Sequence, residues 1–146
     1  MPEATARERV TARLAQLRGS YDGFDIRQTT VTVSPAEFAE IVDDEETVLA
    51  EIRVENEAGD RLLVDGPGGW QPPTTTVSTG QPLSETIRET VARRTGVVPD
   101  IVSLDEAAIV AVGCAASGDE AYQLQLRFLA APDRGEPRPP AAWRES

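Results

Sequence analysis

Four charged residues, Glu85, Glu89, Arg93 and Arg94, have the chemistry for two different kinds of binding site. Glu85 and Glu89 offer carboxylate oxygens, which are the ligands that Mg2+ and Mn2+ prefer in proteins. Arg93 and Arg94 would repel such a cation, whereas a guanidinium donates to phosphate in a fixed fork and needs no metal. Each group also has an ordinary alternative role. Arginines in the last turn of a helix are stabilised by its dipole, by about 0.3 to 1 kcal/mol each, and a glutamate one turn from an arginine forms an ion pair.

A predicted helix carries these residues. Leu83, Ile87 and Val91 recur at i, i+4 and i+8, which is the spacing of a buried helix face. Ahead of this helix, the β-branched residues 74–76 resist positive φ, so the loop that they form is expected to be more extended and its pocket to have a different shape.

Residues 70–97 resemble the Nudix box, whose pattern is G-x5-E-x7-R-E-U-x-E-E-x-G-U, where U is bulky and apolar. The frame of the motif is present: the W-x-x-P lead-in, the Gly before the first Glu, the U of R-E-U and the closing T-G-U correspond to Trp70, Pro73, Gly80, Val91 and 95–97. Its characteristic residues are replaced. The same register puts Thr75 at the first Gly, Gln81 at the first Glu, Glu89 and Thr90 at the R-E pair, and Arg93 and Arg94 at the E-E pair.

In the Nudix family, the box glutamates hold Mg2+ or Mn2+, which bridges a diphosphate and activates the attacking water. Because those carboxylates are absent, the resemblance implies a Nudix-like protein that is catalytically inactive, holds no metal and needs no cofactor. It would act as a nucleotide-like anion-binding, sensing or interaction module. The residues expected to bind the ligand are Arg93, Arg94, Thr90, Gln81 and Trp70.

Two alternatives stay open. A Nudix hydrolase that cleaves a nucleoside diphosphate linked to another moiety would need atypical metal ligands such as Glu85 and Glu89, with Mg2+ or Mn2+ as its cofactor. Glu106 and Glu120 are further carboxylates for such a role. A structural subunit would instead use an uncovered sheet face to bind a second copy, as a homodimer, or another protein.

The composition bounds the class of protein. The 146 residues suffice for one domain with a core, and 40% of them are hydrophobic. The formal charge is -11, all 14 basic residues are Arg, and there is no His. Such an acidic surface argues against nucleic-acid and membrane partners, because both present phosphates. It suggests a halophilic, high-salt cytoplasm, where salt screens charge to roughly 3 Å at 1 M.

The cysteine and the N-terminus agree with a cytoplasmic location. Cys114 is the only cysteine, lies in an apolar run and is expected to be a small buried residue. The N-terminal residues lack the apolar core of a signal peptide, and no run reaches the ~20 apolar residues of a membrane span.

The first half of the chain alternates helix and strand patterns. Residues 3–18 predict an amphipathic helix, 28–33 a strand, and 35–42 a short helix that begins with a capping box at Ser34 and Glu37. Residues 48–54 and 62–64 alternate around a turn at 57–60 and predict a β-hairpin.

The second half predicts mainly strands. Residues 97–104, 107–112 and 122–128 are strand candidates, and 132–140 are loop-like. The second large helix of the family is missing, so the 3–18 helix, a partner or a gene boundary must account for the sheet face that it covers. The expected fold is α/β (α+β), a Nudix-type mixed β-sheet sandwiched by helices. An N-terminal helical arm (1–25) would precede a single Nudix-like domain (26–146), best matched over 47–130.

Overall fold

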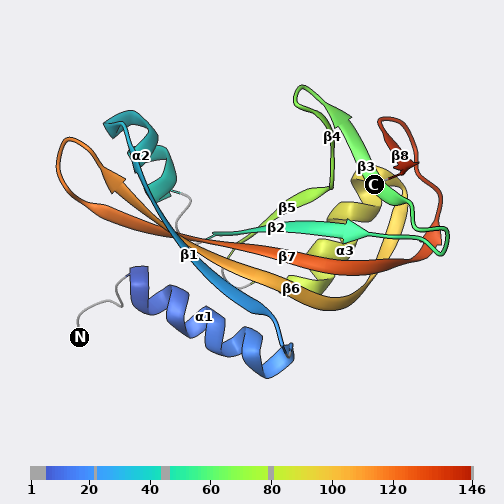
Figure 1. Ribbon diagram of the computed structural model, residues 1–146, viewed down its shortest axis with the longest axis horizontal. Helices are drawn as coiled ribbons and strands as arrows, with labels where there is room; N and C mark the ends of the chain where they lie inside the picture. Colours follow the sequence, from blue (N-terminus) through green and yellow to red (C-terminus); the bar gives the residue numbers. More distant parts are fainter. Residues whose placement is uncertain (1–5, 22, 44–46, 79–80, 146) are drawn as a thin grey trace.

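The computed structural model describes residues 6–21, 23–43, 47–78 and 81–145. It arranges them in three helices and eight strands (Figure 1). In chain order these are α1 (Ala6–Ser20), β1 (Asp25–Val33), α2 (Pro35–Asp43), β2 (Thr47–Val54), β3 (Arg61–Gly66), β4 (Gly69–Gln71), β5 (Thr74–Ser78), α3 (Leu83–Thr95), β6 (Val97–Cys114), β7 (Glu120–Gly135) and β8 (Ala141–Arg144). The motif residue Gly80 lies outside the described residues.

Five strands form a mixed central sheet in the order β1-β6-β7-β2-β5. β1 is parallel to β6 and β2 is parallel to β7, while β6–β7 and β2–β5 are antiparallel pairs. A second, antiparallel sheet has the order β4-β3-β8. The mixed sheet that the sequence predicted is therefore confirmed.

Alternate residues of the central strands build the core, because successive side chains of a strand point to opposite faces. The buried row of β2 consists of Val48, Ala50, Ile52 and Val54. The matching row of β7 consists of Leu124, Leu126, Phe128 and Ala130. The residues between them in sequence are more exposed, so the two faces of the sheet differ in chemistry.

Helices α1 and α3 cover the face that carries Phe128. The ring of Tyr21, just after α1, meets the ring of Phe128 edge-on, with 5.5 Å between the centroids. The hydroxyl of Tyr21 also lies 3.1 Å from the hydroxyl of Ser84, in the first turn of α3. α1 adds Val10 and Leu17 to the core, so the helix that the sequence set apart as an arm shares the core of the rest of the chain.

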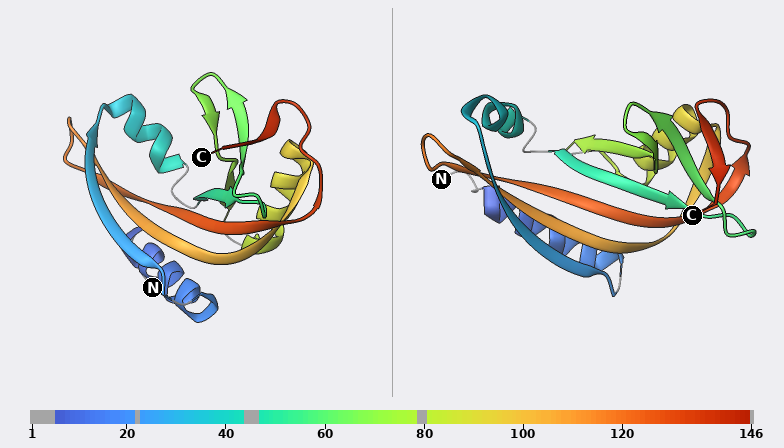
Figure 2. Two further views of the ribbon diagram at one scale, coloured as in Figure 1. Left: turned by 45° about the vertical axis from the view of Figure 1, so that its right-hand side comes forward. Right: turned by 45° about the horizontal axis from the view of Figure 1, so that its top comes forward.

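Helix α2 lies on the other side of the sheet, near the turn between β6 and β7 (Figure 1). The right-hand view of Figure 2 shows α1 and α3 behind the strands. Together these helices confirm the predicted sandwich. None of the helices formed by the described residues is long and apolar enough to cross a membrane.

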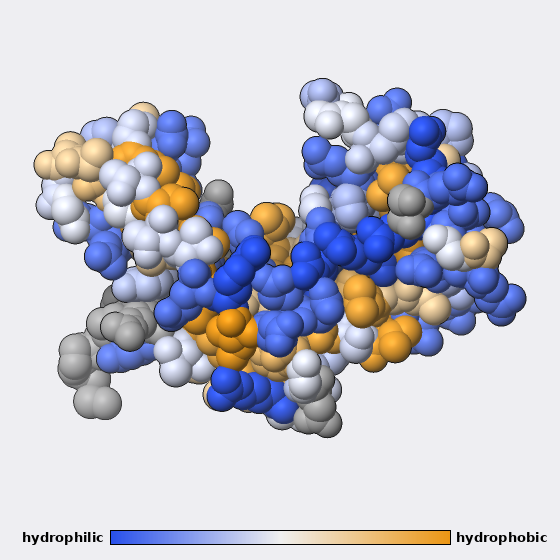
Figure 3. All heavy atoms as spheres, in the orientation of Figure 1, coloured by the Kyte–Doolittle hydropathy of each residue, from blue (hydrophilic) through white to orange (hydrophobic). Residues whose placement is uncertain are grey.

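The rest of the face opposite α1 and α3 is open. Every element in the described residues 97–145 is a strand, so none of these residues covers this face with a second large helix. α1 does not replace it, because α1 packs beside α3. Figure 3 shows the resulting hollow between the α2 end and the β3–β4 end, with a largely hydrophilic floor. We call this surface the open face.

The predicted β-hairpin of residues 48–64 is wrong. The turn exists, since Asn56 N–H donates to the carbonyl of Asp60 and Glu55 bridges to Arg61. Beyond it the strands separate: β2 pairs with β5 and β7, and β3 pairs with β4 and β8. Because β5 and β7 occupy both edges of β2, the next strand in the chain, β3, cannot pair with β2 and joins the other sheet.

Several predicted boundaries also change. Residues 97–112 form one strand rather than two, and the break expected near Asp105 is a register irregularity between Leu104 and Glu106. The tail predicted as a loop continues β7 to Gly135 and then forms β8, which pairs with β3. β1 begins at Asp25 and not at Gln28. The helices predicted at 3–18 and 35–42 are found as α1 and α2.

Candidate functional site

Helix α3 is held by its apolar row and by its C-terminus. Ile87 and Val91 are buried, as the spacing predicted, and Leu83 packs against the core. The helix ends at Gly96, whose φ of 87° is left-handed and whose N–H donates to the carbonyl of Ala92. Only glycine adopts this conformation without strain. Helix α3, the helix of the Nudix box (called the box helix below), is therefore fixed at its C-terminal end, which carries Arg93 and Arg94.

Thr95 connects this helix end to the next strand. Its fully buried hydroxyl donates to the carbonyl of Val91 at 2.6 Å and accepts the N–H of Val97 at 3.1 Å. Since a buried donor without a partner is costly, these bonds fix where β6 leaves α3.

The polar residues predicted to bind a ligand do not form one cluster. Gln81, ahead of α3, accepts the N–H of Ser78 through its side-chain oxygen at 2.9 Å. Thr90 is 8% exposed and faces the core side of the helix. Arg94 lies in the last turn, so a single small ligand does not reach both Arg94 and Gln81.

Arg94 and Arg93 have different surroundings. The Arg94 Nη1 donates to the carbonyl oxygen of Thr74, the first residue of β5, at 2.7 Å. Arg93 is exposed, and its backbone carbonyl accepts a bond from Arg138 Nη2 at 3.0 Å. Of the two arginines at the E-E positions, Arg94 is therefore the one directed toward the segment that precedes the box helix.

Arg94 borders a groove of about 200 Å3. The groove lies between the β3–β4 turn and the start of β5, and no acidic side chain lines it. Its lining residues are Val64, Gly66, Pro67, Gly68, Gly69, Gln71, Pro72, Pro73, Thr74 and Arg94. A Cβ placed on Gly68 would lie 2.8 Å from Nε2 of Gln71, so the amide of Gln71 lies over that glycine. We call this the Arg94 groove.

Trp70 lies in the neighbouring strand β4 but is not among the residues that line the Arg94 groove. Its ring is 37% exposed, and the guanidinium carbon of Arg144 lies 4.4 Å from the ring centroid. This cation–π contact occupies part of the surface that a stacked ligand would use.

The two glutamates of α3 have different surroundings. Glu85 lines a cavity between α1 and α3 that Arg13 also lines, and Glu89 is exposed. Across the described part of the chain, no three Asp, Glu, Cys or His side chains are placed to hold a metal together. Among ion pairs of the described residues, Arg88 bonds Asp133 at 3.3 Å and none joins Glu89 to Arg93, so the expected pair at those positions is wrong.

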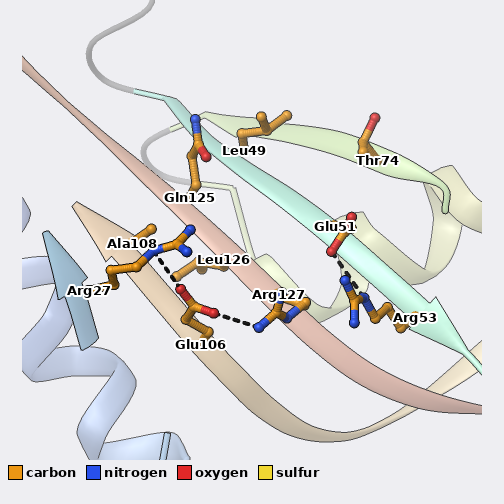
Figure 4. Close-up of a pocket in the computed structure, with 10 residues that line it drawn as sticks. All are labelled: Arg27, Leu49, Glu51, Arg53, Thr74, Glu106, Ala108, Gln125, Leu126 and Arg127. Carbon is orange, nitrogen blue, oxygen red and sulfur yellow. Dashed lines mark hydrogen bonds and ion pairs between the residues drawn. The ribbon is translucent and has the colours of Figure 1, made fainter. Parts of the chain in front are cut away.

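A second hollow, on the open face, was not predicted from the sequence. It has a volume of about 290 Å3 and is lined by Arg27, Leu49, Glu51, Arg53, Thr74, Glu106, Ala108, Gln125, Leu126 and Arg127 (Figure 4). The alternating pattern of β2 and β7 marked some of these as outward-facing. The pairing of β1 with β6, which brings Arg27 to the hollow, left no local signal in the sequence.

Cross-strand ion pairs stabilise the floor of this hollow. Arg127 bonds Asp105 through Nε at 2.8 Å and also bonds Glu106 through Nη2. Burial disfavours the charged guanidinium, but the bond to Asp105 and the charges of Glu106 and Asp105 outweigh it and raise the pKa of Arg127. The other oxygen of Glu106 lies 2.9 Å from Arg27 Nε, within ion-pair distance but without hydrogen-bond geometry.

Cys114 is buried, as predicted, at the end of β6. Hydrogen bonds from the Ser117 hydroxyl and from the backbone of Ala116 and Ser117 hold the pKa of its thiol below the ordinary value.

Comparison with known proteins finds similar folds among solved structures. No protein-family profile matches the sequence, and no curated protein matches it. Among solved structures, the chain is similar to the MutT mutator protein from Bacillus halodurans, with 20% identity over 68% of each chain and a TM-score of 0.53. It is also similar to a NUDIX hydrolase from Nitrosomonas europaea, with 21% identity over 68% of this chain and 72% of that chain, and a TM-score of 0.50.

The class of protein that this architecture defines is the Nudix fold. The resemblance inferred from residues 70–97 is therefore confirmed at the level of fold. Likeness at this identity carries no activity with it, since one fold hosts many functions and function depends on the site.

Proposed function

We propose that this Nudix-fold protein binds a small phosphate-bearing anion, of the nucleotide kind, in the Arg94 groove. Binding would need no divalent metal, and the ligand would not be hydrolysed. The observation that carries the proposal is that Arg94, a basic residue at a position where the Nudix box has an acidic one, is the only charged side chain among the described residues that line the groove.

The chemistry of Arg94 fits a phosphate. Its bond to Thr74 uses one of five N–H donors, which leaves four for a ligand. A guanidinium presents these donors in a fixed fork that matches two phosphate oxygens.

The surroundings of Arg94 add uncharged donors. The turn of residues 66–69 contains three glycines, and Gly69 has a φ of 93°. Without side chains, backbone N–H groups can approach an anion closely. Gln71 and Thr74 add an amide and a hydroxyl at the same groove.

The electrostatic setting makes this groove distinctive. The chain carries a formal charge of -11, so an approaching anion is repelled by most of the surface. A lining with one base and no acid is a local exception. The substituted box also disfavours hydrolysis, because Gln81, Thr90, Arg93 and Arg94 cannot supply the carboxylates that a hard divalent cation needs.

A combined thermal-shift and phosphate-release screen tests this proposal. The probes are nucleoside di- and triphosphates, sugar nucleotides and dinucleoside polyphosphates, each with Mg2+, with Mn2+ and with chelator, in high salt. We expect stabilisation that persists in chelator, without turnover, and is lost in Arg94→Ala. Arg93→Ala is the matched control, because Arg93 is also exposed in the last turn but does not line the groove.

The alternatives make distinct predictions in the same screen. Metal-dependent phosphate release that Glu89→Gln abolishes would establish the hydrolase and overturn this proposal. No response to any anion would favour a protein partner.

A further inference from the structure

We propose that two copies of this chain associate through β1, by antiparallel pairing of their β1 strands into one continuous sheet. This interaction surface is separate from the Arg94 groove and does not depend on the function proposed for it.

Strand β1 is an open edge of the central sheet. Among the described strands it pairs with β6 alone, and it is the terminal strand of the order β1-β6-β7-β2-β5. Its side chains from Asp25 to Thr32 are all exposed, including Ile26 at 38% and Val31 at 40%. The left view of Figure 2 shows β1 at the border of the sheet, with α1 below and α2 above.

This edge lacks the features that normally prevent strands from pairing with a neighbour. Natural edge strands are short, or carry lysine, proline or a bulge. β1 has nine residues, contains no Lys, Pro or Gly, and keeps its register with β6 from Asp25 to Val33 without a shift. A regular edge of this length offers a row of backbone donors and acceptors to a further strand.

A second copy suits this edge because the strand is nearly neutral in a strongly acidic chain. β1 carries one acid, Asp25, and one base, Arg27, and residues 28–33 are uncharged. An antiparallel two-fold arrangement centred on Thr30 places the uncharged residues 28–32 opposite each other. Two chains of charge -11 repel each other, and this uncharged strip lowers the local repulsion where the two β1 strands approach.

The pairing residues also favour each other. Residues 30–33 alternate threonine and valine, and β-branched residues pack well across neighbouring strands. The two-fold axis of this arrangement is perpendicular to the sheet, so it does not turn either copy over. The open faces of both copies would therefore lie on the same side of the joined sheet. Salt must strengthen the association, since it screens the repulsion between the two acidic chains.

Sedimentation velocity of the full chain at several concentrations, in low and in molar KCl, tests the proposal. We expect a monomer–dimer equilibrium that shifts toward the dimer in molar KCl. Val31→Lys should weaken dimerisation by roughly tenfold or more, because it brings two like charges close to each other across the two-fold axis. Val102→Lys is the control, since Val102 is 67% exposed on β6 and adds the same charge away from this edge.

Amide hydrogen exchange on the unmodified chain gives a second readout that no substitution can disturb. Amides of residues 25–33 should exchange more slowly as protein concentration rises. A chain that stays monomeric in both salts, a dimer that Val31→Lys leaves unchanged, or exchange in 25–33 that is independent of concentration would overturn the proposal.

Discussion

Arg94 and Thr74 are joined by a 2.7 Å hydrogen bond, from the guanidinium of the last turn of α3 to the carbonyl oxygen of the first residue of β5. The bond connects the end of the box helix to the segment in which the motif begins. A positively charged side chain thus holds the C-terminal end of α3 against the start of β5. The remaining donors of Arg94 border a groove without acidic residues.

The buried hydroxyl of Thr95 should matter more than its methyl group. Thr95→Val keeps the shape but leaves Val97 N–H without its partner, so the free energy of unfolding should fall by about 1 to 3 kcal/mol. Thr95→Ser keeps the hydroxyl and should cost less. Chemical denaturation of both variants measures the difference, and equal losses would show that packing rather than hydrogen bonding fixes this helix end.

Alanine substitutions at Gly96 and Gly118 distinguish the cost of a left-handed backbone from the cost of a steric clash. Both have positive φ, 87° and 74°, so alanine at either position costs roughly 1 to 2 kcal/mol for the left-handed conformation. At Gly96 a Cβ would also lie 2.5 Å from the carbonyl oxygen of Glu136, whereas at Gly118 nothing lies within 4 Å. Gly96→Ala should therefore lower the melting temperature clearly more than Gly118→Ala, and the reverse order would contradict the close approach seen here.

The ion pairs of the open face should contribute unequally to stability. The Glu106 side chain is 15% exposed and interacts with both Arg127, at 30%, and Arg27, at 67%. Arg127→Met should lower the free energy of unfolding by roughly 1 to 3 kcal/mol, because it removes the more buried of the two arginines that interact with Glu106. Arg27→Met removes a mostly solvated pair and should cost less than about 1 kcal/mol. Urea denaturation of the two variants compares them directly, and equal costs would argue against this ranking.

The acidic composition predicts a response to salt. Self-repulsion at a formal charge of -11 should make the folded chain more stable in molar KCl than in dilute buffer. Thermal unfolding across a KCl series, with a neutral osmolyte as control, measures this. A stability that does not change from low to molar salt would remove the reason to infer a high-salt cytoplasm.

Local sequence patterns predicted the helices and strands better than they predicted which strands pair with each other. The row Leu83, Ile87 and Val91 located the buried face of α3, because a helix repeats every 3.6 residues wherever it packs. The β-branched residues 74–76 were expected to make the loop before the helix more extended, but they form part of the strand β5. Pairing is a non-local property, so the turn at 57–60 suggested a hairpin even though β2 takes β5 and β7 as its neighbours.

The candidate site could be predicted only in part for the same reason. The motif register identified Arg93 and Arg94 and showed that the carboxylates are absent. It could not separate the two arginines, because the acceptor of Arg94 and the groove residues come from other strands. The open-face hollow depends on five strands whose order no local pattern reveals.

Calorimetric titration of ADP into the full chain, in high salt with chelator, is the most direct test of metal-free anion binding by Arg94. We expect saturable binding without metal, a loss of about tenfold or more in affinity for Arg94→Ala, and little change for Arg93→Ala. Binding that appears only when Mg2+ or Mn2+ is restored, or that Arg94→Ala leaves intact, would contradict it.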